Sequence, residues 1–144
     1  QIRYKGKKFT KKMSYSSYKN IGVIPDESNN NSFKVHDVQN LDERNMAIKN
    51  YPVVVIDNYT SWCGPCKVIA PKFAVLAQKY EEKGILFIKE DVGKNIGSAP
   101  KIRGVPCFHF YVGGKYNEGS TVIGADLAEV ENNLLEIIQK TSKK

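Results

Sequence analysis

The sequence lacks any apolar run long enough to cross a membrane, and it has few cysteines. None of its apolar runs approaches the ~20 residues that a membrane-spanning helix needs. Its 3 cysteines are an odd number and too few for a small scaffold held together by disulfides. A chain of 144 residues, 41% of them hydrophobic, is long enough for one hydrophobic core but not for two. We therefore expect a single globular domain.

The first 32 residues also lack any apolar periodicity. They mix lysine, serine and asparagine with scattered aromatic residues, a composition that buries too little apolar surface to offset the entropy lost on ordering. They hold seven basic and two acidic residues, a net charge of +5, whereas the whole chain carries +7. We therefore expect residues 1–32 to form a basic, flexible N-terminal extension and residues 33–144 to form the domain.

A basic extension of this kind has several potential partners. Nucleic acid, an anionic membrane surface and an acidic protein would all attract it, and it could equally stay solvated. No nucleic-acid motif accompanies it, so we do not expect nucleic-acid binding. Because the sequence opens on Gln1, we expect a processed or shortened chain, from which a signal sequence could have been removed. The sequence leaves the compartment open.

From residue 33 onwards, strand and helix patterns alternate. Runs of β-branched and aromatic residues predict strands at 33–38, 53–59, 85–91, 106–112 and 116–123. Helices are expected from Asn40 to about Lys49, from the cysteine pair to Tyr80, and after Asp126. This order predicts an α/β sheet that is covered by helices on both faces and closed by a hairpin at Gly113-Gly114.

Two cysteines lie two residues apart in the stretch TSWCGPCK (residues 60–67), where a strand ends and a helix begins. Free backbone N–H groups and the helix dipole stabilise a thiolate at such a position, so Cys63 is expected to be nucleophilic. Cys66, one turn further, is expected to be more enclosed and well placed to attack a mixed disulfide on Cys63. A structural disulfide and a zinc site are the alternatives. Zinc would need Cys107 and His109 as further ligands, although both lie on a predicted strand.

The motif Trp62–Lys67, followed by Pro71 and later by Val105-Pro106, resembles the thioredoxin family. The resemblance covers residues 33 to about 142 and implies the thioredoxin fold, an α/β architecture with a central mixed β-sheet flanked by helices on both faces. Further positions match the family one by one. Asp57 corresponds to the family's buried acid, and Lys89 corresponds to the charge partner of that acid across the sheet. Pro106 corresponds to the cis-proline that faces the disulfide, Gly124 to the glycine that lines the substrate groove, and Pro71 to the proline that kinks the helix.

The resemblance also implies how the reaction would run. Cys63 would attack a protein disulfide, Cys66 would resolve the mixed disulfide, and Asp57 would exchange the proton of Cys66. Burial raises the pKa of a carboxyl group, and Lys89 would moderate that effect. Proline has no N–H, which leaves the backbone of Val105 free to pair with an extended substrate segment. Substrate contacts are expected from Trp62, Gly64, Pro65, Val105, Pro106 and Gly124.

By the same resemblance, no metal and no cofactor are expected besides the redox-active disulfide of Cys63 and Cys66, and electrons would come from NADPH through a thioredoxin reductase. The Gly-Pro pair between the cysteines implies a reductase, whose potential lies below that of disulfide isomerases. Two other functions stay open. One is a disulfide isomerase or oxidase, and the other is a redox-capable subunit or interaction module of a larger protein-translocation or folding complex.

Three positions depart from the family pattern. Cys107 follows the expected cis-proline, where a small polar residue is usual, so it is either a packed core residue or a third thiol. Asn58 and Tyr59 stand beside Asp57 in place of an aromatic residue and a tryptophan. These replacements leave the electrostatics around the buried acid open.

Overall fold

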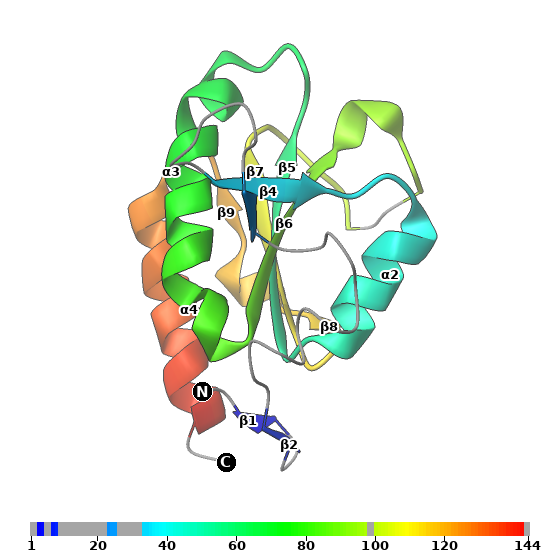
Figure 1. The fold of residues 1–144 in the computed structure, drawn as a ribbon. Helices are drawn as coiled ribbons and strands as arrows, with labels where there is room; N and C mark the ends of the chain where they lie inside the picture. The colour runs from blue at the N-terminus through cyan, green and yellow to red at the C-terminus, as the bar shows by residue number, and fades with distance from the viewer. Residues whose placement is uncertain (1–2, 5–6, 9–22, 26–32, 98–99, 143–144) are drawn as a thin grey trace.

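The computed structural model describes residues 3–4, 7–8, 23–25, 33–97 and 100–142 (Figure 1). Its strands are β1 (Arg3–Tyr4), β2 (Lys7–Lys8), β3 (Val23–Pro25), β4 (Phe33–Asp37), β5 (Val53–Tyr59), β6 (Ile85–Asp91), β7 (Cys107–Val112), β8 (Lys115–Tyr116) and β9 (Val122–Ile123). Its helices are α2 (Leu41–Asn50), α3 (Gly64–Tyr80) and α4 (Leu127–Ser142), with short 3-10 helices η1 (Glu81–Lys83), η2 (Val92–Lys94) and η3 (Glu118–Ser120).

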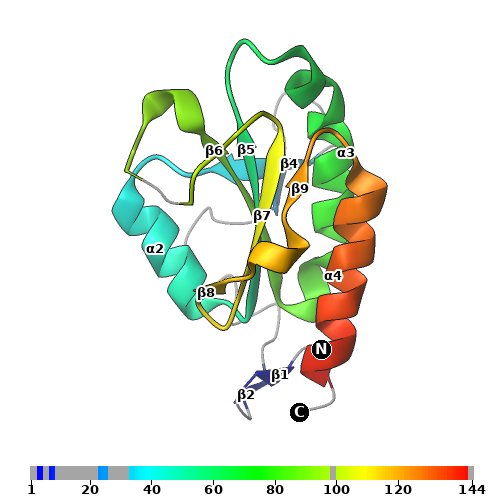
Figure 2. The same cartoon turned by 180° about the vertical axis from the view of Figure 1, so that it is seen from behind.

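A seven-stranded mixed sheet forms the centre of the domain. Its order is β3-β4-β6-β5-β7-β8, with β9 paired to β7. β4 and β5 run parallel to β6, whereas β7 runs antiparallel to β5. Helix α2 covers one face of the sheet, and α3 and α4 cover the other (Figures 1 and 2). The predicted mixed sheet with helices on both faces is therefore confirmed.

Strands β5 and β6 begin and end at the predicted residues, and in each the first four residues are all apolar and buried. The predicted helix starts are confirmed too. The Asn40 side chain accepts a hydrogen bond from the Glu43 N–H at 2.9 Å, and Asp126 Oδ1 accepts one from the Glu129 N–H at 3.0 Å. Each bond satisfies a backbone donor that has no partner within its helix, so the chain turns into α2 and α4 at these residues.

The sheet separates two apolar layers. On one face, Phe73 of α3 packs its ring 5.4 Å from that of Phe87 and 5.5 Å from that of Phe108, between centroids. On the other face, Ala47 of α2 lies in a second cluster with Ile56 and other sheet residues. Side chains alternate along a strand. Val53 and Val55 face α3 and α4, so Asp57 and Tyr59 share that face, whereas Asn58 faces α2.

The hairpin after β7 differs from the prediction. Gly113 and Gly114 form the turn with φ of 60° and 82°, but the expected strand at 116–123 is divided into β8 and β9 by η3. The Asn117 side chain donates a hydrogen bond to Ser120 Oγ at 3.1 Å. Such local side-chain bonds favour a turn over a continuous ladder, which accounts for the interruption.

The predicted flexible extension at 1–32 lies mostly outside the described residues. Within it, β1 and β2 pair with each other, and β3 pairs antiparallel with β4. The sheet therefore includes a strand from before residue 33, which the sequence analysis did not expect because three residues are too few to show a period. No helix in the described ranges is both long and apolar enough to span a bilayer.

Candidate active site

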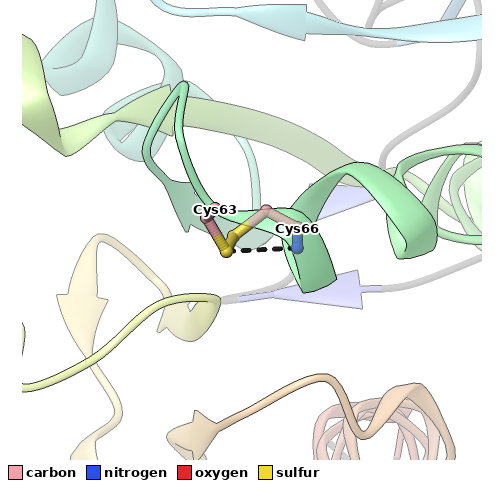
Figure 3. Close-up of a disulfide and its surroundings, with 2 residues drawn as sticks. All are labelled: Cys63 and Cys66. Carbon is pink, nitrogen blue, oxygen red and sulfur yellow. Dashed lines mark hydrogen bonds between the residues drawn. A yellow bond between two sulfur atoms is a disulfide. The ribbon is translucent and has the colours of Figure 1, made fainter.

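A disulfide joins Cys63 and Cys66 at the start of α3, with a Cα–Cα distance of 5.3 Å (Figure 3). Cys63 is the N-cap of this helix, and its Sγ accepts a hydrogen bond from the Cys66 N–H at 3.2 Å. Pro65 lies in the first turn, where its missing N–H costs nothing. When the disulfide is reduced, the same N–H and the positive end of a 17-residue helix would stabilise a thiolate on Cys63.

The disulfide is buried, but the residues on either side of Cys63 are exposed. In this oxidised state, Cys63 is 7% exposed and Cys66 4%, so the expected difference in enclosure is small. The neighbouring Trp62 is 74% exposed, and Gly64 and Pro65 are exposed as well. An indole that contacts so little of its own chain offers its apolar face to another molecule beside the sulfur atoms.

The peptide bond between Val105 and Pro106 is cis. Pro106 directly precedes β7, whose first residue, Cys107, pairs with Asn58 near the end of β5. The cis-proline therefore lies at the end of the sheet from which the chain continues to the disulfide. Its carbonyl accepts a hydrogen bond from the Gly124 N–H at 2.8 Å, and the φ of 107° at Gly124 is one that favours glycine.

Asp57 is a buried acid on the sheet face that α3 covers. It is 3% exposed and pairs across the sheet with Lys89 of β6. Burial raises the pKa of Asp57 from 3.8 to about 7, while Lys89 lowers it and Asp37 raises it. Its Oδ1 atom has no hydrogen-bond partner among the described residues. At neutral pH the carboxyl group is therefore close to half-protonated and able either to take or to give a proton.

Two further residues on this face, Tyr59 and Asp37, were not among the predicted site residues. The Tyr59 hydroxyl donates a hydrogen bond to Asp37 Oδ2. The Lys89 Nζ lies 5.2 Å from the centroid of the Tyr59 ring. Burial and the hydrogen bond to Asp37 raise the pKa of the Tyr59 hydroxyl, so it remains a donor at neutral pH. Strand alternation put Tyr59 on the face of Asp57, but its contact with Asp37 depends on strand pairing.

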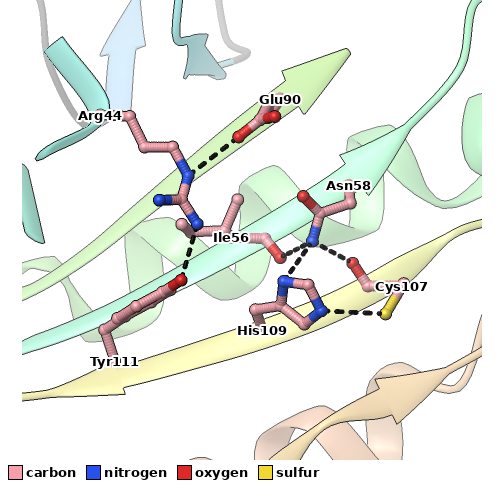
Figure 4. Close-up of polar contacts among 7 residues, drawn as sticks. All are labelled: Arg44, Ile56, Asn58, Glu90, Cys107, His109 and Tyr111. Atoms are coloured by element: carbon pink, nitrogen blue, oxygen red, sulfur yellow. Dashed lines mark hydrogen bonds and ion pairs between the residues drawn. The ribbon is translucent and has the colours of Figure 1, made fainter. Parts of the chain in front are cut away.

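The opposite face carries a buried polar cluster that the sequence analysis missed (Figure 4). Arg44 of α2 forms an ion pair with Glu90, with Nε 3.0 Å from Oε1, and donates a hydrogen bond to the Tyr111 hydroxyl at 2.7 Å. The Asn58 amide donates to the Cys107 carbonyl at 2.9 Å and contacts His109 Nδ1 at 3.2 Å. These contacts connect α2 and three strands on the side away from Asp57.

Within this cluster, Cys107 Sγ lies 3.5 Å from His109 Nε2. Burial and the charge of Arg44 lower the pKa of His109 to about 4, and burial raises the pKa of the Cys107 thiol, followed by the effect of Asp57. Both groups are therefore neutral at physiological pH, and a neutral buried thiol is a poor nucleophile. Within the described ranges, no three Cys, His, Asp or Glu residues are placed to hold a metal ion.

A surface hollow of about 430 Å³ lies beside the cis-proline segment, bordered in part by Val92, Ile102 and Val105. Arg103 and Lys101 add positive charge to its edge. Ile123, which follows Val122 in β9 and precedes Gly124, is 61% exposed. Exposed apolar side chains therefore lie both next to Cys63, at Trp62, and next to Gly124, at Ile123.

Comparison with known proteins agrees with this geometry. The thioredoxin family model matches residues 33–139. The thioredoxin of Coprinus comatus is 36% identical over 107 residues, which is 72% of this chain and 94% of that protein. Oxidised mitochondrial thioredoxin 3 from Saccharomyces cerevisiae superposes with a TM-score of 0.63 at 30% identity, over 70% of this chain and 93% of that one. A Plasmodium falciparum thioredoxin gives 0.60 at 30% identity, over 74% and 98%. The chain belongs to the thioredoxin family of protein-disulfide oxidoreductases.

Proposed function

We propose that the protein reduces disulfide bonds of client proteins by dithiol exchange at Cys63 and Cys66. The observation that carries the proposal is the Cys63–Cys66 disulfide at the N-terminus of α3, on the sheet face that also holds the buried Asp57, whose pKa burial raises to about 7. The helix N-terminus would stabilise a thiolate on Cys63, and a carboxyl group with a pKa near 7 can exchange the proton of Cys66.

The reaction starts from the reduced dithiol. The Cys63 thiolate attacks one sulfur of the client disulfide, forms a mixed disulfide and releases the other client sulfur as a thiolate, which takes a proton. Asp57 removes the proton of Cys66, whose sulfur then attacks Cys63 Sγ. The Cys63–Cys66 disulfide forms, the second client thiolate leaves, and the client has gained the two electrons that the protein has lost.

The client would dock on the apolar rim around the disulfide. Trp62 and Ile123 supply exposed apolar surface. The Val105 backbone would pair with an extended segment of the client, because Pro106 offers no N–H that would compete. Gly64, Pro65 and Gly124 have little or no side-chain bulk to obstruct that segment. This arrangement favours client disulfides in extended, accessible segments.

The chain itself would carry electrons only through its disulfide. Thioredoxin reductase, using NADPH, is the proposed donor that restores the dithiol. The basic residues at 1–32 would serve a different purpose, the binding of an acidic partner or complex, because the cysteines and Asp57 all lie in the domain that follows.

The test of this mechanism is the asymmetry between the two cysteines. A Cys66→Ser variant lacks the resolving thiol and is expected to accumulate mixed disulfides with clients, whereas Cys63→Ser lacks the attacking thiolate and is not. Both variants are assayed on non-reducing gels after incubation with a disulfide-bonded protein. Cys107→Ser in each background controls for the third thiol. Equal trapping by both variants would contradict the assigned roles.

A further inference from the structure

A second carboxylate lies in the same cross-strand row as Asp57. Asp37 of β4 pairs with Lys89 of β6, and Lys89 pairs with Asp57 of β5. Val35, two residues before Asp37, packs in the cluster on the α3 face, so Asp37 points to that face as well. Neighbouring strands lie ~4.8 Å apart, so the backbones of β4 and β5 lie about 10 Å apart, with Lys89 on the strand between them.

Tyr59 holds this row together. It is two residues beyond Asp57 on the same strand, and its hydroxyl donates a hydrogen bond to Asp37 Oδ2. The face of its ring attracts the ammonium of Lys89, whose Nζ lies 5.2 Å from the ring centroid. The contacts run from Asp37 through Tyr59 to Lys89, and Lys89 is the cation that lowers the pKa of Asp57.

Lys89 is the cross-strand neighbour of both carboxylates. Asp37 Oδ1 and Asp57 Oδ1 are both buried, and neither has a hydrogen-bond partner in the part of the chain that the structure describes. The remaining titratable groups around the row are Cys66 on α3, which the disulfide occupies, Asp91 at the end of β6, which acts on Tyr59, and the neutral Cys107 on β7. Among the described residues, Lys89 therefore lies in register between the two carboxylates and is the cation that acts on Asp57.

We propose that Asp37, anchored by Tyr59, draws the charge of Lys89 away from Asp57 and is thereby a positioning residue for proton exchange at Asp57. Its relevance to the reaction rests on the proposed role of Asp57 as the proton acceptor. Consistent with this arrangement, Asp37 raises the pKa of Asp57 and Lys89 lowers it. Burial supplies most of the rise in the pKa of Asp57, and the second acid would add a smaller rise to it.

The experiment is a direct titration of the Asp57 carboxyl group by ¹³C NMR in the oxidised protein, where Cys66 cannot titrate. Asp37→Asn is nearly isosteric and removes one negative charge. At about 10 Å and an intermediate dielectric constant, its loss is expected to lower the pKa of Asp57 by roughly half a pH unit. Asp37→Ser, which is also neutral and can still accept a bond from Tyr59, is the second variant should Asp37→Asn fold poorly.

The Tyr59→Phe substitution is expected to shift the pKa of Asp57 in the opposite direction. It keeps the ring beneath Lys89 but frees Asp37 to approach the lysine, so the pKa of Asp57 is expected to rise. Asp42→Asn, an exposed acid on α2, controls for the loss of a surface charge and is expected to leave the titration unchanged. An Asp57 titration that does not move in the Asp37 variants, or that moves equally in Asp42→Asn, would overturn the inference.

The pH profile of protein-disulfide reduction separates this inference from the proposed mechanism. If Asp57 is the proton acceptor, the midpoint of the profile in Asp37→Asn moves down together with the Asp57 titration. A shifted titration with an unshifted profile would support the inference about Asp37 and overturn the catalytic role of Asp57.

Discussion

Replacing Asp57 with asparagine is expected to stabilise the oxidised protein strongly at about pH 8 and hardly at all at about pH 4. The pKa of this buried acid rises from 3.8 to about 7 on folding. Between these two values, the native state holds a proton that the unfolded chain has lost, so the free energy of unfolding falls as the pH rises. A difference of about 3 pH units corresponds to roughly 4 kcal/mol, the cost of the buried charge above pH 7. Because asparagine is uncharged, the Asp57→Asn variant does not lose this free energy of unfolding as the pH rises.

The assay is urea unfolding of the wild type and the Asp57→Asn variant at both pH values, with the disulfide intact. The stabilisation by the substitution is expected to grow from near zero at low pH to several kcal/mol at high pH, with its midpoint between 3.8 and about 7. Glu118→Gln, which removes an exposed acid, is the matched control and should show no such growth. A gain of equal size at both pH values would refute the reasoning, because a packing effect does not titrate.

Three further outcomes follow from the structure. Glu90→Gln removes the negative charge that pairs with the buried Arg44 and is expected to cost about 3 kcal/mol in urea unfolding, whereas exchanging both residues for apolar ones should restore most of the loss. Cys107 is expected to resist alkylation at pH 7 in the native protein and to react after denaturation, and rapid native labelling would contradict its neutral, buried state. Removing residues 1–20, which leaves β3 in place, should not change the rate of disulfide reduction in a turnover assay. Loss of bound acidic partners on that truncation would support the role of the extension in binding, and a lost reductase activity would contradict its separation from the active site.

Much of the fold could be predicted because the signals were local. β5 and β6 each begin with four consecutive apolar residues, and Asn40 and Asp126 each begin a helix through a bond to a residue three positions ahead. The division between β8 and β9 could not be predicted, because it depends on competition between turn bonds and strand pairing. β3 is too short to be recognised without its partner strand.

Some residues of the candidate site could likewise be predicted from the sequence, and others could not. Cys63, Cys66 and Asp57 could be named as candidate site residues from a short stretch of sequence and its resemblance to a family, and the structure places all three on the side of the sheet that α3 covers. Asp37 could not, because its contact with Tyr59 joins residues 22 positions apart and exists only in the register of three paired strands. The Arg44–Tyr111 contact joins residues 67 positions apart and could not be predicted from the sequence either. Polar residues in the middle of apolar strands, such as Glu90 and His109, were the signal that a buried network was present.

The most direct test of the central claim is the equilibrium reduction potential of the Cys63–Cys66 pair. The protein is equilibrated against a series of glutathione ratios, and the fluorescence of Trp62, the chain's one tryptophan, reports the fraction reduced. A reductase with this dithiol is expected near −270 mV, the value typical of thioredoxins. A potential of about −180 mV or higher, in the range of disulfide isomerases and oxidases, would contradict the proposed function.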